Sequence, residues 1–123
     1  MQAETWLAVA AIGALLAVAF GAFGAHGLEG RVAEELLVVF ETGARYHMYH
    51  ALGLAAVALA GMLRPQLSIQ GPAWALTLGT LIFSGSLYLM VLTGQRWLGA
   101  VTPIGGTALM VGWGWFAVRL LRA

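Results

Sequence analysis

The sequence has no cysteine, and it is poor in charge: six arginines and five glutamates supply all of its charged residues, 9% of 123. The absence of cysteine excludes disulfides, thiolate metal ligands and thiol nucleophiles. The formal net charge is +1, and the arginines form no basic stripe. Nucleic acid is therefore excluded as a partner.

Hydrophobic residues make up 61% of the chain. They are concentrated in uncharged stretches at Thr5–Gly27, Leu67–Gln95 and Trp97–Val118. Each stretch reaches the roughly 20 residues that a helix needs to cross a hydrocarbon core of about 30 Å. The composition predicts an integral membrane protein with the lipid bilayer as its surroundings.

A fourth span is predicted by a length argument. The apolar run between His50 and Arg64 rises only about 20 Å as a helix, which is too short for the bilayer core. The helix must therefore extend backward to about Gly43. This extension brings Tyr46 and His47 to the membrane boundary together with His50.

The predicted fold is an all-α membrane protein, a four-transmembrane-helix bundle in a single domain over residues 1–123. A short amphipathic helix is expected over Leu28–Thr42, between spans one and two, because apolar and charged residues alternate there at helical spacing. Span four is expected to begin either at Trp97 or at Thr102, which resembles an N-cap because Pro103 follows it in the first turn. The expected spans cover about residues 6–25, 43–63, 73–93 and 98–121.

Four spans place both termini on one side of the membrane. The arginines divide three and three between the two sides, so the positive-inside rule alone gives no orientation. Arg45 lies partly within a span, and this favours cytoplasmic termini.

Small residues recur every four positions in span one, at Gly13, Ala17 and Gly21, and so they line one helix face. Such a face lets another helix approach closely in lipid. Two interpretations stay open: a contact with a second copy or a partner membrane complex, and packing within the chain. Internal packing is the favoured one.

The three histidines, His26, His47 and His50, are weak candidates for metal ligands, because three imidazoles can hold zinc or copper and a pair can hold haem. No HExxH motif accompanies them, so no cofactor is expected. Anchoring at the membrane boundary is favoured over proton or ligand handling. The polar residues that could form a functional cluster are His26, Arg45, Tyr46, His50, Ser84 and Thr102.

Four stretches carry a family resemblance: FGAHGL at 23–28, TGARYHMYHAL at 42–52, FSGSLY at 83–88 and TPIGG at 102–106. In this order they resemble the YgdD-like small membrane proteins, domain-of-unknown-function family 423. The resemblance implies a four-span inner-membrane protein, found mainly in bacteria, without an activity to carry over. His47 occupies a position where the family pattern has glutamine or other polar residues, which weakens the case for a three-histidine site.

The favoured function is non-enzymatic: a structural, packing or accessory protein of the bacterial inner membrane, since no nucleophile and base stand together in the sequence. The alternative is a small transporter or channel that uses His26 and His50 for protons or a ligand. Small multidrug exporters carry a carboxylate within their first span, and Thr5–Gly27 has none. A third possibility is a redox subunit that uses the histidines for haem, metal or quinone.

Overall fold

The computed structural model describes all 123 residues and is entirely helical. A π-helical turn, Phe23–Gly27, extends the first helix, and a 3-10 turn, Arg96–Ala100, precedes the last. All four long helices are long and apolar enough to cross a membrane, so the predicted all-α, four-span fold is confirmed. These helices are α1 (Ala3–Ala22), α2 (Glu34–Leu63), α3 (Gln70–Thr93) and α4 (Thr102–Arg122).

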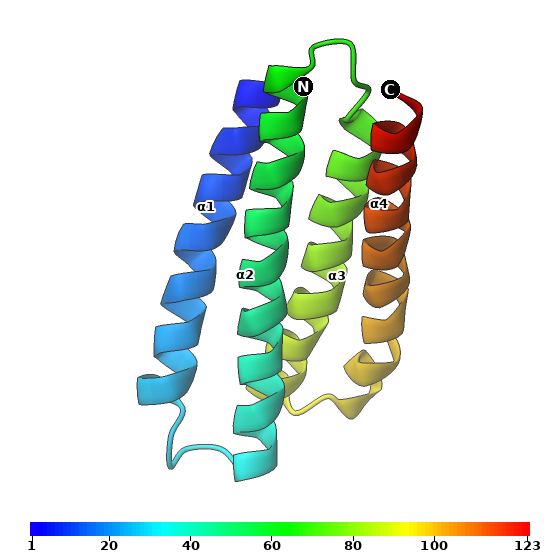
Figure 1. Cartoon of the computed structure of the whole chain (residues 1–123). Coiled ribbons are helices and arrows are strands. Elements are labelled where there is room, and N and C mark those ends of the chain that lie inside the picture. The colour runs from blue at the N-terminus through cyan, green and yellow to red at the C-terminus, as the bar shows by residue number, and fades with distance from the viewer.

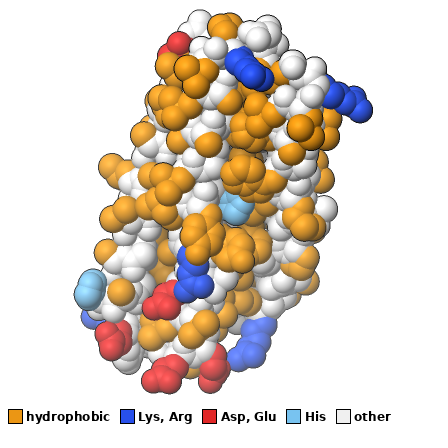
Figure 2. All heavy atoms as spheres, viewed as in Figure 1, with side chains coloured by type: hydrophobic (Ala, Val, Ile, Leu, Met, Phe, Trp, Pro, Cys, Tyr) orange, Lys and Arg blue, Asp and Glu red, His pale blue; other side chains and the backbone are white.

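The helices pack in chain order, α1 on α2, α2 on α3 and α3 on α4, each antiparallel to the one before (Figure 1). Both termini lie at one end of the molecule, beside the connection between α2 and α3; we call this the terminal end. The α1–α2 and α3–α4 connections lie at the other end, called the connection end. Hydrophobic side chains cover most of the face in Figure 2, and the charged ones gather near the two ends.

The amphipathic segment is not a separate helix, and this detail of the sequence prediction is wrong. Its residues from Glu34 onward form the first turns of α2, which continues through Gly43 without a break. The connection before it turns at Gly30, in the left-handed conformation with φ 77°. No proline or cap interrupts residues 34–43, so the helix that starts outside the membrane continues into it.

The length of α2 explains where its charged residues lie. Its 30 residues rise about 45 Å, well beyond a hydrocarbon core of about 30 Å. The first turns, which carry Glu34, Glu35 and Glu41, therefore stand in the headgroup region at the connection end.

The small-residue face of α1 packs inside the molecule. A Cβ on Gly13 would lie 3.4 Å from the Cβ of Ala51, and one on Gly21 would lie 3.9 Å from that of Ala44. Ala17, between them, is buried. Because α2 packs against this face, the structure agrees with the favoured interpretation, packing within the chain.

The α3–α4 pair comes closer still. A Cβ on Gly105 would collide with the backbone of Phe83, so α4 lies against α3 with no side chain between them at this point. Such close approach gains dispersion contacts, which hold helices together where lipid offers no hydrophobic drive. Gly105 therefore sets the distance between these two helices.

Candidate functional site

His47 lies at the junction of three helices, and its ring Nδ1 is 3.0 Å from the hydroxyl of Tyr88 on α3. The Tyr88 ring in turn stacks on Phe20 of α1, with centroids 4.6 Å apart. Tyr88 is buried, and a buried hydroxyl proton needs an acceptor. We therefore assign Tyr88 as the donor and His47 Nδ1 as the acceptor, which leaves the proton of neutral His47 on Nε2.

His50 lies one turn further along α2 and is buried at 9% exposure. Its Nδ1 is 2.7 Å from the backbone carbonyl oxygen of Tyr46. A carbonyl can only accept, so Nδ1 carries the proton and neutral His50 keeps a bare Nε2. Tyr46 itself is partly exposed, and its ring lies 4.9 Å from that of Phe83.

Serine and threonine hydroxyls join the helices at two further points. Ser84 is buried and donates to the carbonyl of Gly43 at 2.7 Å, so α3 is joined to α2. Ser86 and Thr102 share a hydrogen bond of 2.6 Å, which joins α3 to α4. Hydroxyls in membrane helices commonly make such bonds, to their own backbone or to a neighbouring helix.

Thr102 is not the N-cap of α4, so this expectation is wrong. The helix includes Thr102 as its first residue, the N-cap position is Val101, and no side chain caps it. The preceding 3-10 turn ends at Ala100, immediately before the cap, so the chain enters α4 already helical. The hydroxyl is thereby directed to Ser86 rather than to the free amides of its own helix.

His26 and Arg45 lie apart from this site. His26 is exposed in the π-helical turn, beyond the point where Gly24 packs against Phe40. His50 is about 15 Å further along α2 from Phe40, by the rise of a helix. The three histidines therefore do not converge, and no group of three or more His, Cys, Asp or Glu residues stands close enough to hold a metal. Arg45 is exposed on α2.

A lateral slot opens between α1 and α3, with α2 as its floor. It consists of two adjoining cavities of about 290 and 170 Å³, which share Leu16, His47, Thr80 and Leu81 in their linings. Below we call this feature the α1–α3 slot. Its walls are mainly apolar, and its floor includes both His47 and His50.

Aromatic pairs bridge α1 and α3 at both ends of the α1–α3 slot. Trp6 and Trp74 meet edge to face toward the terminal end, with centroids 4.9 Å apart. Phe20 and Tyr88 stack toward the connection end and line the smaller cavity. The slot can accept an apolar group from the bilayer, with the His47–Tyr88 pair as the polar contact within reach.

The predicted polar cluster is thus divided. Tyr46 and His50 are joined through a backbone carbonyl, while Ser84 and Thr102 each join a different pair of helices. Tyr88 ends the FSGSLY stretch at 83–88, but nothing in the sequence identified His47 as its partner. That pairing depends on how α2 and α3 are rotated about their axes, which a single sequence does not encode locally.

The fold and the site define a class: a four-span membrane protein whose polar side chains bond mostly within the chain. A family model described as "Protein of unknown function (DUF423)" matches residues 20–106. The chain belongs to this family, as its four landmark stretches indicated. It is a multi-pass protein of the cell membrane.

Curated relatives match almost the full chain. The UPF0382 membrane protein YwdK of Bacillus subtilis is 49% identical over 111 residues, 89% of this chain and 90% of its own. The UPF0382 inner membrane protein YgdD of Escherichia coli is 35% identical over 122 residues, 99% of this chain and 93% of its own. No solved structure matches.

Proposed function

We propose that this chain is a non-catalytic accessory protein of the bacterial inner membrane, which acts by packing beside other membrane components. One observation carries the proposal: the polar side chains within the spans bond to groups of the same chain. The bonds of His47 and Ser84 join α2 to α3, the bond of Ser86 joins α3 to α4, and the bond of His50 stays within α2. Catalysis or transport needs polar atoms directed at a substrate, and here those atoms position helices.

The alternative function, a small transporter or channel that uses His26 and His50, requires those residues to share a path. His26 is exposed at the connection end, whereas His50 is buried in the middle of α2. The α1–α3 slot passes His50 and opens sideways to lipid. This arrangement favours the accessory role.

Proteoliposomes distinguish the two functions. We expect the purified chain to give no cation flux above that of empty vesicles, with or without a pH gradient. In mild detergent, it is expected to retain a defined membrane protein from its native membrane in constant ratio. A pH-dependent flux that is abolished by His50→Ala, in a variant with unchanged helicity, would overturn the accessory role.

Cytoplasmic termini are part of the proposal. The terminal end holds Arg64, Arg119 and Arg122, while at the connection end Arg45 lies within α2 rather than in a connection. The chain has no cysteine, so single cysteines are clean reporters. A membrane-impermeant maleimide added to spheroplasts is expected to label Glu29→Cys and to spare Ser68→Cys, and the reverse pattern would invert the orientation.

A further inference from the structure

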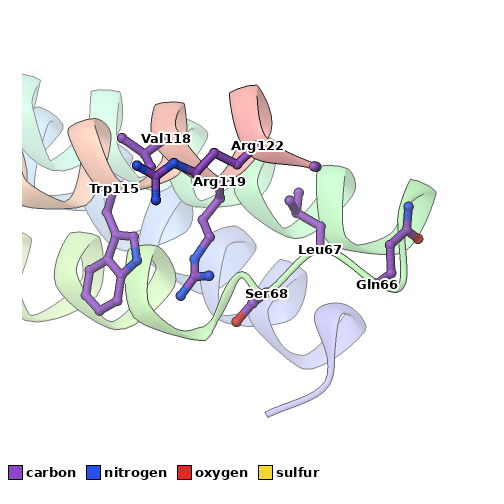
Figure 3. Close-up of a pocket in the computed structure, with 8 residues that line it drawn as sticks. Gln66, Leu67, Ser68, Trp115, Val118, Arg119 and Arg122 are labelled. Carbon is purple, nitrogen blue, oxygen red and sulfur yellow. The ribbon is translucent and has the colours of Figure 1, made fainter.

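A second cavity, of about 400 Å³, lies at the terminal end between the last turns of α4 and the α2–α3 connection (Figure 3). Arg119 and Arg122 line it from α4, and Gln66 and Ser68 line it from the connection. Figure 3 shows the Arg119 side chain pointing toward Ser68, with Trp115 beside it. Below, the cavity lined by these five residues is called the terminal arginine cavity.

The wall that Trp115 provides is fixed by packing. The Trp115 ring lies directly over Gly71 at the start of α3 and leaves no room there for a Cβ. Trp115, Arg119 and Arg122 follow one another at helical spacing, so they share one face of α4. Tryptophan and arginine at a helix end are typical of the membrane–water interface. The cavity therefore lies at the depth of the lipid headgroups.

The side chains around this cavity are unbalanced in charge, and the last residue, Ala123, is also part of its lining. The terminal end carries Arg64, Arg119 and Arg122, and its one acidic side chain, Glu4, lines an adjoining cavity that shares Leu67 and Ser68 with this one. The four other glutamates lie at the connection end. A guanidinium group forms paired, charge-assisted hydrogen bonds to phosphate oxygens, and basic pockets at helix ends bind anionic lipid headgroups.

We infer that the terminal arginine cavity binds a phosphate group, with Arg119 and Arg122 as the charged contacts and Gln66 and Ser68 as polar contacts from the opposite wall. Two sources share this chemistry, the headgroup of an anionic phospholipid and free inorganic phosphate. The depth of the cavity favours the lipid. This phosphate site is inferred independently of the accessory role proposed above.

Native mass spectrometry of the full chain released from detergent micelles tests the site, with phosphatidylglycerol and phosphatidylcholine as probes. We expect one phosphatidylglycerol to be retained in preference to phosphatidylcholine. The double variant Arg119→Gln, Arg122→Gln is expected to bind it at least about 10-fold more weakly, because two charge-assisted contacts are lost.

Arg64→Gln is the matched control, because Arg64 carries the same charge at the same end and does not line the cavity. This substitution should weaken phosphatidylglycerol binding by less than about fivefold, because one surface arginine contributes about that much to lipid attraction. Ser68→Leu fills the cavity without changing the charge, and it is expected to weaken binding as the double variant does. It also replaces the double variant if that protein fails to fold.

Addition of millimolar inorganic phosphate separates the two sources. If the lipid is the ligand, phosphate leaves the retained phosphatidylglycerol unchanged. Displacement of the lipid by phosphate, together with direct phosphate binding in the absence of lipid, would assign the site to the soluble ion. Equal losses for Arg64→Gln and the double variant, or no preference between the two lipids, would overturn the site.

Discussion

Small residues line the contact between α3 and α4 and the contact between α1 and α2, yet the helices of the first pair lie closer together. At Gly105 the backbone of α4 lies against the backbone of α3, whereas at Gly13 the Cβ of Ala51 still leaves room for a methyl group at 3.4 Å. In addition, α1 meets α3 through the aromatic pairs at the ends of the slot and through hydrogen bonds that Met1 and Trp6 donate to Gln70, the first residue of α3. The difference indicates that α3 and α4 lie closest together, whereas α1 and α3 leave the α1–α3 slot between them.

The largest effect is expected at Gly105. Gly105→Ala places a methyl group against the backbone of Phe83, which cannot give way as a flexible side chain can. We expect a loss of about 2 kcal/mol in the free energy of unfolding, in the range for overpacked sites. Unfolding by sodium dodecyl sulfate, followed by circular dichroism, measures the loss.

Gly114→Ala is the control on the same helix, because nothing lies within 4 Å of a Cβ at Gly114. It should leave stability unchanged or raise it slightly, since alanine favours the helix over glycine. Equal losses for the two variants would mean that α4 does not lie against α3 at Gly105.

A smaller effect is expected at the bond that joins α3 to α2. Ser84→Ala removes the hydroxyl that donates to the Gly43 carbonyl. Interhelical hydrogen bonds in membranes contribute about 0.6 kcal/mol on average and up to about 1.7, and we expect about 1 for this buried one. Thr107→Val is the control, because its hydroxyl bonds within α4 to Pro103. The same detergent titration should show a smaller loss for the control.

Tyr88→Phe tests the contact nearest α1. The substitution keeps the ring that stacks on Phe20 and removes only the hydroxyl that bonds to His47. We expect a loss of about 0.6 kcal/mol, the average for such bonds. Tyr49→Phe, at an exposed position on α2, should have no effect. A null result at Tyr88 would contradict the assignment of Tyr88 as donor to His47.

The smallest effect is expected at Gly13. Gly13→Ala brings a methyl group into ordinary van der Waals contact with Ala51, so the free energy of unfolding should change by less than about 0.5 kcal/mol. A loss as large as that of Gly105→Ala would show that α1 packs on α2 as tightly as α4 packs on α3. The comparison between the two pairs would then fail.

The four spans could be predicted because the physics that sets them is local. The uncharged stretches have the length of the bilayer core, and the short run between His50 and Arg64 required α2 to include His47. The separate amphipathic helix could not be excluded from the sequence. A helix that lies on the membrane and one that continues into it share the same 3.6-residue period.

The polar site could be predicted only in part, for a related reason. Hydrogen bonds to residues four positions away, such as that of His50 to Tyr46, follow from helical spacing. Bonds between helices, such as those of Ser84 to Gly43 and Ser86 to Thr102, depend on which faces the helices turn toward one another. Close approaches between backbones, which a single sequence does not specify, set those rotations.

The length of α2 has a consequence for how the molecule is held in the bilayer. Arg45 lies on this helix and Arg64 is the residue that caps its end, about 28 Å away along the axis, which is close to the thickness of the hydrocarbon core. Each guanidinium can reach the headgroups on its own side, so sliding of the helix along the membrane normal draws one of them into the core. The two arginines thus match the chain to one bilayer thickness, and in a thinner membrane the helix has to tilt.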